Sequence, residues 1–481
     1  MTKKSELKVY NTLAGKKEVF VPQVEGRVGM YVCGPTTYNY IHLGNARPLV
    51  VFDTVRRYFE YLGYQMTYVQ NFTDVDDKII NKAQEEKEQP LQLAARYVEE
   101  YFKDAEALNV QRASVHPKVS EHMSEIIDFV QALVVKGYAY ESEGDVYFSV
   151  TSFDQYGKLS KRDLADLQAG ARVEVTEQKR HPGDFALWKS AKPGEPSWSS
   201  PWGEGRPGWH IECSAMSHKY LGQTFDIHAG GMDLIFPHHE NEIAQSEACY
   251  GSPMARYWLH NGFITVNQEK MSKSLGNFFM LRDILKKFSG QVIRFYLLST
   301  HYRSPIDFDD DKLEVAKRGL ERLQTSYRLL VEALLKAKGD KMGQTSLESE
   351  LKGDVLSVKE RFLEAMNDDF NTALAIAVLF DLARISNAYI MEDANDQEKL
   401  TVLENARKLF LDFAGVLGLK LEGEGNLASV ELEQEVDKLI KERQEARGNK
   451  DFQKADNIRE KLKEMGVILE DTPQGIRWRL K

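Results

Sequence analysis

An apolar strand, a helix and a second strand follow one another near the N-terminus, and this order is what most constrains the fold. Residues 28–33 (VGMYVC) form a strand-like run, and apolar side chains then recur at helical spacing over 51–62. Pro48 suits the first turn of this helix, and Gly63 suits its end. Alternating residues over 66–70 predict the next strand. We therefore expect a βαβ unit, whose two strands run parallel.

The segment between the first strand and this helix contains a candidate phosphate site. It places His42 and Gly44 near the helix N-terminus, where free backbone N–H groups and the helix dipole favour an anion. A glycine there also lets a nucleotide approach the backbone closely. A histidine that only satisfies a turn is the alternative interpretation of His42.

A second candidate phosphate signal lies far downstream, at residues 270–274 (KMSKS). Lys270 and Lys273, separated by small residues and followed by Leu-Gly-Asn, suit a mobile loop that closes on a polyphosphate and opens to release it. A solvated basic turn is the alternative. Because both signals occur in one chain, we interpret them together as a nucleoside triphosphate site.

These two segments resemble the signatures of the class I aminoacyl-tRNA synthetases, a His-Ile-Gly-His motif and a Lys-Met-Ser-Lys-Ser loop. The second signature matches in full, whereas the first has Leu43 in its second place and Asn45 in its fourth. Leu43 keeps an aliphatic packing residue. Asn45 offers a neutral amide donor, so we expect function with a somewhat different pH dependence; asparagine here is also familiar among bacterial cysteine enzymes of the family.

A third group of residues is a candidate metal site. Cys33 and Cys213 are accompanied by His238 and Glu242, which at i and i+4 would project from one helix face. Two thiolates, one imidazole and one carboxylate make a plausible zinc set. Spacing alone favours two buried cysteines and an ordinary surface His/Glu pair. His239 is the alternative to His238 as a ligand.

The resemblance favours the metal, because cysteinyl-tRNA synthetases hold zinc with these four motif positions. It implies one zinc ion per chain and cysteine as the amino acid. An apolar pocket separates near-isosteres such as cysteine and serine by only about a hundredfold. Zinc binds a thiolate directly, whereas a serine hydroxyl stays protonated and binds poorly. We therefore expect the substrate sulfur to join the zinc, and no editing domain to be needed.

The same resemblance implies the other site residues. Residues 71–78 (NFTDVDDK) and 230–234 (GGMDL) are similar to the family's strand-end motifs. Asp233 would then bind the substrate ammonium, although an Asp after two glycines also suits a cap of a turn or helix. Thr73 and Trp209 would line the pocket or have structural roles. The implied ATP-binding residues are Thr36, His42, Gly44, Asn45, Lys270 and Lys273, with Mg²⁺ carried by ATP; His42, Lys270 and Lys273 would be catalytic.

The C-terminal part has a charge balance that differs from the rest of the chain. The net charge of −10 argues against nucleic-acid binding, but over residues 438–463 nine basic and five acidic side chains leave a local balance of +4. A solvated helix face is the alternative. The hairpin-like segment 466–478 resembles the family's small anticodon-binding unit. The residues that fit base-edge recognition are Asp456, Arg459 and Asp471, and Trp478 would stack on a base or pack.

Chain length and cysteine usage set broader limits. The 481 residues suit about three domains. Only three cysteines are present, which indicates a reducing compartment, with Cys249 as a small core residue. No apolar segment follows the N-terminus, and we expect no stretch long and apolar enough to span a bilayer. These features predict a soluble cytoplasmic protein without a membrane partner, which we expect to be a monomer.

The expected architecture is a Rossmann-type α/β catalytic domain with a parallel sheet, followed by a helical bundle and a small C-terminal α+β unit. A turn-rich insertion at about 116–224 would separate the two nucleotide-binding halves, and its tryptophans would pack an irregular segment. The expected boundaries are 1–306 for the catalytic domain, 307–420 for the bundle on the tRNA and anticodon side, a flexible linker over 421–426, and 427–481 for the anticodon-binding unit.

The expected function is to activate cysteine with ATP to cysteinyl-adenylate and to transfer it to the 3′ end of cysteine tRNA. Three other functions are considered. A cysteine ligase with an amino-sugar acceptor would leave the helical and basic C-terminal parts without a use. A simple nucleotidyltransferase would need neither the zinc set nor the length. A non-catalytic RNA-binding relative would lose phosphate residues, yet His42, Gly44 and Lys273 are present.

Overall fold

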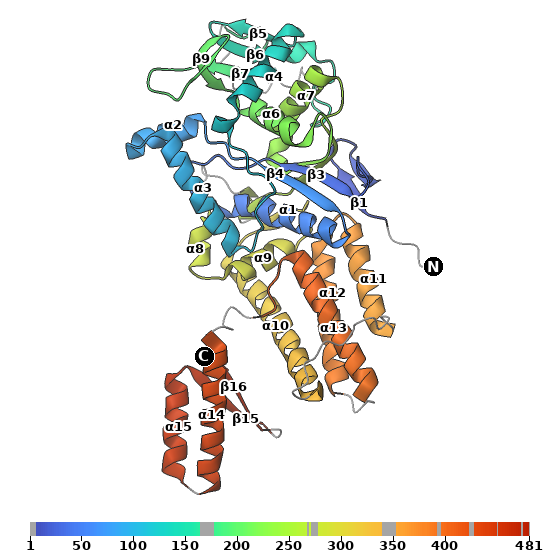
Figure 1. Cartoon of the computed structure of the whole chain (residues 1–481), viewed down its shortest axis with the longest axis vertical. Coiled ribbons are helices and arrows are strands. Elements are labelled where there is room, and N and C mark those ends of the chain that lie inside the picture. Colours follow the sequence, from blue (N-terminus) through green and yellow to red (C-terminus); the bar gives the residue numbers. More distant parts are fainter. Residues whose placement is uncertain are drawn as a thin grey trace. The chain divides into compact units, whose positions relative to one another are not determined.

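The polypeptide forms two compact units, residues 1–421 and residues 422–481, each with a hydrophobic core of its own. Figure 1 shows the order of their helices and strands. The computed structural model describes residues 6–163, 178–266, 269–270, 278–338, 353–391, 396–422, 428–449, 451–472 and 475–480.

A parallel sheet of four strands lies in the larger unit, in the order β11, β10, β3, β4. Its strands β3 and β4 are labelled in Figure 1. Its inner strand β10 and its neighbour β11 are buried along almost their whole length, as expected for strands covered on both faces. This arrangement confirms the predicted Rossmann-type α/β fold. The strands are β3 (Arg27–Val32), β4 (Gln65–Gln70), β10 (Phe225–Gly231) and β11 (Ala255–Asn261).

The βαβ unit predicted near the N-terminus is present, with α1 (Leu43–Tyr61) between the parallel strands β3 and β4. Gly63, with a φ of 91°, follows the end of α1 as predicted. The prediction for Pro48 is wrong, because α1 begins at Leu43 and Pro48 therefore lies in its second turn. A cap formed by His42 starts the helix upstream of the apolar pattern that located it.

The insertion between β4 and β10 contains a regular sheet of five antiparallel strands, in the order β5, β6, β7, β9, β8. The expectation of an irregular segment is wrong, because strands this short carry little periodicity. Trp188 is fully buried in this part, and Trp198 and Trp202 are partly buried. The elements are α4 (Met123–Val135), β5 (Ala139–Ser142), β6 (Asp145–Phe148), β7 (Phe185–Ser190), β8 (Trp198–Ser200), β9 (Gly203–Pro207) and α6 (Trp209–Leu221).

Shorter elements surround the parallel sheet. The N-terminal hairpin is attached to β11 through Asn11, whose amide donates to Arg256 O at 3.0 Å and accepts from Trp258 N at 3.1 Å. The remaining elements of this region are β1 (Lys8–Asn11), β2 (Lys16–Val19), α2 (Asp77–Glu86), α3 (Pro90–Ala107), α7 (Glu240–Tyr250), β12 (Ile264–Val266), β13 (Glu269–Lys270), α8 (Leu281–Leu285), α9 (Gly290–Leu298) and β14 (Ile306–Asp307).

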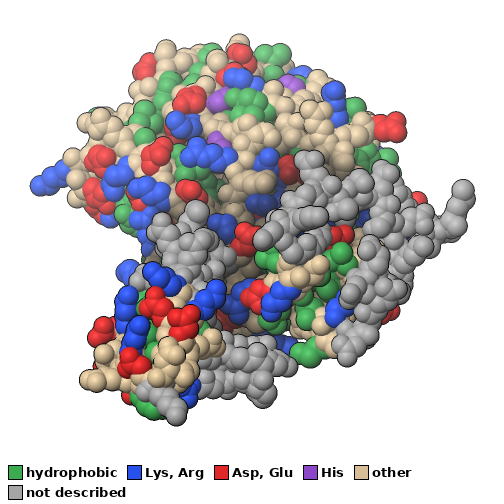
Figure 2. Space-filling view, turned by 60° about the horizontal axis from the view of Figure 1, so that its bottom comes forward, with side chains coloured by type: hydrophobic (Ala, Val, Ile, Leu, Met, Phe, Trp, Pro, Cys, Tyr) green, Lys and Arg blue, Asp and Glu red, His purple; other side chains and the backbone are tan. Residues whose placement is uncertain are grey.

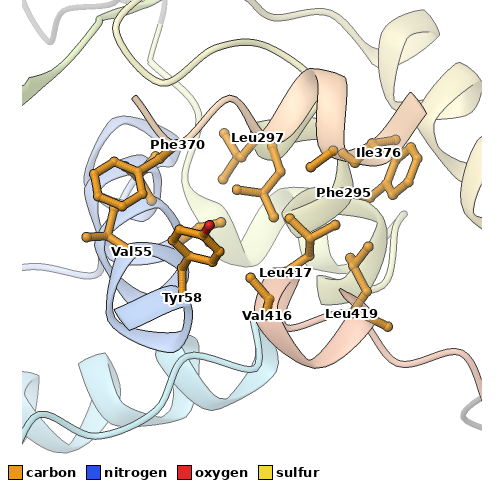
Figure 3. Packing of buried hydrophobic residues seen from close by; sticks show 14 of the residues in the cluster. Val55, Tyr58, Phe295, Leu297, Phe370, Ile376, Val416, Leu417 and Leu419 are labelled. Carbon is orange, nitrogen blue, oxygen red and sulfur yellow. The ribbon is translucent and has the colours of Figure 1, made fainter. Parts of the chain in front are cut away.

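The helices that follow pack directly on this α/β region. Figure 3 shows Val55 and Tyr58 of α1 and Leu297 of α9 together with Val416 and Leu417, and all five belong to one buried cluster. The bundle therefore shares its core with the helices that cover the parallel sheet. Its helices are α10 (Asp310–Lys338), α11 (Gly353–Asn367), α12 (Thr372–Met391) and α13 (Asp396–Leu417).

One helix among the described residues, α12, is long and apolar enough to cross a bilayer by length and composition, with a mean hydropathy of 1.5. The expectation that no stretch reaches this limit is therefore wrong. The position of α12 gives the physical reason, because Leu379 and Leu382 are fully buried in the core that α12 shares with the other bundle helices. Its apolar composition serves packing within the bundle.

The smaller unit consists of α14 (Ala428–Gly448), α15 (Phe452–Glu464) and a hairpin of β15 (Val467–Thr472) and β16 (Gly475–Leu480). Val436, Ile458 and Leu462 are among the residues of its core. The predicted hairpin is thus present, with Trp478 paired to Leu469 in the ladder.

Over the face drawn in Figure 2, Lys and Arg side chains lie interspersed with Asp and Glu side chains. The linker predicted over 421–426 lies largely outside the described residues.

The segments that follow β3 and β4 run side by side beyond the ends of these two strands. Gly34 N donates to Asn71 Oδ1 at 2.9 Å, and Thr37 N donates to Thr73 O at 3.1 Å. A Cβ on Gly34 would lie 1.6 Å from Asn71 O. Only glycine fits here without a movement of the backbone.

We expect Gly34→Ala to lower the free energy of unfolding of the larger unit by about 2 to 3 kcal/mol, because the added methyl group overlaps a backbone carbonyl. Gly415→Ala is the matched control: it lies in α13 with open space around its Cβ, and should be neutral or stabilising by up to about 1 kcal/mol. Urea unfolding followed by circular dichroism measures both. Equal midpoints for the two variants would contradict this account.

Candidate active site and metal centre

His42 forms the N-terminal cap of α1 together with Asn45. His42 Nδ1 accepts from Asn45 N at 3.2 Å, and Asn45 Oδ1 accepts from His42 N at 3.3 Å, which makes a reciprocal capping box. With Nδ1 accepting, the neutral ring carries its proton on Nε2, as a phosphate-binding donor requires. The sequence predicts for Asn45 only a hydrogen bond donated to phosphate, and not this capping role. A polar residue three positions after the cap is nevertheless a known capping signal.

The structure brings the first signature next to the segment that follows the second. Leu43 N donates to Phe279 O and Leu281 N donates to Ile41 O, both at 3.1 Å, and the His42 ring lies 5.7 Å from that of Phe278. Backbone hydrogen bonds thus join two distant parts of the sequence at this place.

Of the predicted lysines, only the backbone of Lys270 is described. It lies in β13, where it pairs with Thr265 of β12. Residues 271–277, with Lys273, lie outside the described residues. Of the other residues predicted to bind ATP, Gly44 lies in the first turn of α1, and Thr36 forms a bridge with Thr73 in the paired segments beyond β3 and β4.

Cys33, Cys213, His238 and Glu242 come together in one cluster, and their ligand atoms all lie within 4.8 Å of one another. The two sulfurs are 3.8 Å apart, and His238 Nε2 lies 3.0 Å from Glu242 Oε1. Two sulfurs bound tetrahedrally at about 2.3 Å from zinc are also about 3.8 Å apart. The donor set and its spacing therefore fit a zinc ion.

The four residues come from four different segments of the chain. Cys33 directly follows β3, and Cys213 is buried on α6. Glu242 lies in the first turn of α7, whereas His238 lies in the π-helical segment Ile235–His239 that precedes that helix. The expected i and i+4 pair is thus in contact, but across the start of α7 and not within it.

The electrostatics of the cluster favour a thiolate at Cys213. The hydrogen bond that Cys33 donates to its sulfur lowers the pKa of Cys213 to about 6, against the opposing effect of burial. Burial raises the pKa of Cys33 well above its ordinary value. A metal ligand must be deprotonated, so one of the two sulfurs is already prepared for that state.

A second ligand set overlaps the first. It consists of Cys33, Glu242, His228 and His239, with Cys33 Sγ 3.3 Å from His239 Nε2 and Glu242 Oε2 2.8 Å from His228 Nε2. His239 Nδ1 is also paired with His260 Nε2 at 2.8 Å. The first set has two sulfur donors at the distance a tetrahedral zinc requires, and the second has one. The first set therefore fits a tetrahedral zinc ion better than the second, and His239 lies beside it.

Two of the residues predicted for the amino-acid pocket, Thr73 and Trp209, contact the cluster or a neighbour of it in sequence. Thr73 Oγ1 donates to Glu212 Oε2 at 2.8 Å, and both side chains are buried. Trp209 is 41% exposed, and its ring lies 4.3 Å from that of His238. Asp233 follows β10 in a short 3-10 helix, Met232–Leu234, whose N-cap is Gly231, so Asp233 does not cap that helix. Sequence reasoning missed Glu212, because nothing in the motif around Cys213 reveals its burial.

Comparison with known proteins agrees with this geometry. Residues 19–318 match the family model of the tRNA synthetases class I (C) catalytic domain, residues 361–422 match the DALR domain, and residues 429–479 match the cysteinyl-tRNA ligase anticodon binding domain. The cysteine–tRNA ligase of Heliobacterium modesticaldum is 64% identical over 98% of this chain and 99% of its own length. That of Geobacillus thermodenitrificans is 54% identical over 99% of both chains.

The chain belongs to the cysteine–tRNA ligase family. It is an aminoacyl-tRNA ligase, as the sequence predicts, and the amino-sugar alternative finds no support, since relatives that span its length are tRNA ligases. Among solved structures, a methionyl-tRNA synthetase of Mycobacterium tuberculosis in complex with methionyl-adenylate has a TM-score of 0.60 and 15% identity over 81% of this chain and 91% of that one. That likeness concerns the fold alone.

The residues predicted to read the anticodon lie in the smaller unit of the ligase. Asp456 and Arg459 are exposed on α15, and Asp471 lies in β15. Three residues apart on α15, Asp456 and Arg459 are neighbours on the surface of this helix. Cys249 is buried, as predicted for a small core residue.

We expect Cys213→Ser and His238→Gln to lose the metal, because each removes a donor from the first ligand set. His228→Gln is the control, since it removes a donor from the second set only and should retain about one zinc ion per chain, with affinity reduced by about 10- to 100-fold at most. Metal content after dialysis, measured by mass spectrometry, separates the two sets. Loss in His228→Gln with retention in His238→Gln would assign the metal to the second set.

Proposed function

We propose that this cysteine–tRNA ligase activates cysteine and charges cysteine tRNA at a site that runs from the Cys33 cluster to the N-terminus of α1. One observation carries the proposal: only eight residues of chain separate Cys33, one of the candidate metal donors, from His42 at the helix cap. A cysteine whose sulfur faces the cluster and whose carboxylate faces the helix N-terminus would meet the α-phosphate of ATP there.

The metal in this proposal is zinc, one per chain, held by Cys33, Cys213, His238 and Glu242. When bound, zinc supplies a thiophilic centre that takes a thiolate in preference to a hydroxyl, and so separates cysteine from serine. Trp209 and Thr73 shape the pocket beside it. Asp233 binds the substrate ammonium with its carboxylate.

Catalysis of adenylate formation rests on charge stabilisation. The substrate carboxylate attacks the α-phosphorus of magnesium ATP, and pyrophosphate leaves. Several groups balance the charge that develops on the phosphates. They are His42, Thr36, the N-terminus of α1 with Gly44 and Asn45, and the lysines of the 270–274 segment. The terminal ribose hydroxyl of the tRNA then attacks the adenylate carbonyl, and AMP leaves. No protein nucleophile is required.

The remaining parts of the proposal concern the tRNA and the setting. Asp456, Arg459 and Asp471 contact the pairing edges of anticodon bases, which single-stranded RNA exposes. The ligase acts in the cytoplasm as a monomer. Three cysteines in 481 residues suit a reducing compartment.

The decisive experiment supplies ATP, magnesium, bacterial tRNA and labelled cysteine to the purified protein, with labelled serine in parallel, and counts acid-precipitable label. Charging by cysteine but not by serine is the expected result. Equal charging by serine would contradict the role of the metal in amino-acid choice. Cysteine-dependent pyrophosphate exchange without charging would contradict tRNA as the acceptor.

We expect Lys273→Ala to slow adenylate formation, because the loss of the lysine raises the activation free energy by about 2 to 4 kcal/mol. The affinity for cysteine should stay nearly intact. Lys286→Ala is the matched control, because Lys286 is exposed on the surface and pairs with Asp283. Pre-steady-state adenylate formation and equilibrium binding of cysteine measure the two effects. A parallel loss of cysteine affinity in Lys273→Ala would argue against the assignment.

A further inference from the structure

The side chain of Arg282 joins the segment that follows the second signature to α3. Its Nε donates to Asp104 Oδ1 at 3.0 Å, and its Nη2 donates to the carboxylate of Glu100. Asp104 is 3% exposed, so this ion pair lies at the edge of the core. Arg282 lies in α8 and both carboxylates lie in α3, and Figure 1 shows these two helices near each other. The edge of the guanidinium group therefore fixes α8 to α3.

The face of the same guanidinium group lies over the ring of Tyr40, which precedes His42 by two residues. Arg282 Cζ is 4.0 Å from the ring centroid, within the range of a cation–π contact. The Tyr40 ring also meets the ring of Tyr97 of α3 edge to face, with centroids 5.3 Å apart. Tyr40 is therefore held by α8 and by α3, the two helices that Arg282 joins.

The contact between Arg282 and Tyr40 continues a pairing of the backbone. His42 pairs with Met280 as an antiparallel bridge. Tyr40 and Arg282 each lie two residues from this pair, in opposite directions along the chain. In an antiparallel pairing, residues with this spacing oppose each other on one face. Arg282 thus helps to set the place of the segment that leads into the cap of α1.

The charges around Arg282 argue against a direct contact with phosphate. Two carboxylates, those of Glu100 and Asp104, oppose a single guanidinium group and leave an excess of negative charge there. A phosphate group beside them would be repelled. Arg282 therefore acts through Tyr40 and the cap of α1, and not as a ligand of the nucleotide.

We propose that Arg282 is a positioning residue for ATP, which holds the cap of α1 at His42 against the segment behind the second signature by stacking on Tyr40. This inference rests on the proposed nucleotide site at the N-terminus of α1. His42 and the first N–H groups of α1 stabilise the phosphates best when they are held in place before ATP arrives. The Cys33 cluster is built from other segments, which end β3, lie in β10 and begin α7, so cysteine binding does not depend on Arg282.

The test uses three variants of the two stacked side chains. Arg282→Lys keeps the charge opposite the two carboxylates but loses the planar face that lies over Tyr40. Tyr40→Leu keeps an apolar side chain and removes the ring, whereas Tyr40→Phe keeps the ring and removes only the hydroxyl. Pyrophosphate exchange is measured while ATP and cysteine are varied in turn, and equilibrium dialysis without ATP gives the Kd of labelled cysteine.

We expect kcat/KM for ATP in pyrophosphate exchange to fall by about tenfold in Arg282→Lys and in Tyr40→Leu, because each variant removes the same contact. The double variant should lose no more than about twofold beyond either single variant, as a shared contact requires. The Kd of cysteine should stay within about twofold of wild type throughout. Tyr40→Phe should keep exchange near the wild-type level, because the ring and not the hydroxyl faces Arg282.

Arg96→Lys is the matched control. Arg96 also lies over a tyrosine ring, that of Tyr97 at 4.7 Å, and it also pairs with two carboxylates, those of Glu86 and Glu88. These partners belong to neither signature. Arg96→Lys should therefore leave kcat/KM for ATP within about twofold of wild type, as expected for an exposed ion pair.

Several results would overturn the inference. Equal losses for ATP and for cysteine would show a general loss of structure, and multiplied losses in the double variant would show two independent effects. Wild-type exchange in Arg282→Lys and in Tyr40→Leu would overturn this inference alone and leave the proposed function in place. A wild type without cysteine-dependent exchange would overturn the proposed function itself. If Arg282→Lys does not fold, the comparison of Tyr40→Leu with Tyr40→Phe decides the matter.

Discussion

A single buried carboxylate, that of Glu242, organises the candidate metal site. It is 0% exposed, and one oxygen lies 2.8 Å from His228 of β10 while the other lies 3.0 Å from His238. Burial opposes its charge, but the two histidines hold the pKa of Glu242 well below its ordinary value. A buried charge is stable only when hydrogen-bonding or oppositely charged partners surround it. Glu242 therefore brings together β10, the start of α7 and Cys33.

The backbone around this carboxylate continues to the N-terminus of α1, where we propose that the nucleotide binds. Gly34 follows Cys33 directly and crosses Asn71 so closely that no side chain fits between them. Beyond this crossing, the chain reaches the cap of α1, where His42 and Asn45 satisfy each other's backbone groups. The parallel sheet thus presents two kinds of chemistry at neighbouring strand ends, as open α/β sheets do.

Much of this could be predicted from sequence because it depends on local patterns. The βαβ unit, a place for His42 near a helix N-terminus and the grouping of Cys33, Cys213, His238 and Glu242 follow from spacing or from resemblance. What failed depends on contacts between distant residues. The short strands of the insertion have too little periodicity, and α12 resembles a membrane span until its place in the bundle is known. The burial of Glu212 against Thr73 and of Arg294 against Asp53 leaves no sequence signal.

The shared core of Figure 3 has a consequence for how such a chain can be divided during evolution. Because α1, α9 and α13 contribute to one continuous apolar interior, the bundle cannot be exchanged for another without exposing the back of the nucleotide fold. The smaller unit, with a core of its own, carries no such restriction. Residues 422–481 can therefore be replaced with less disturbance of the shared core than the helices before them.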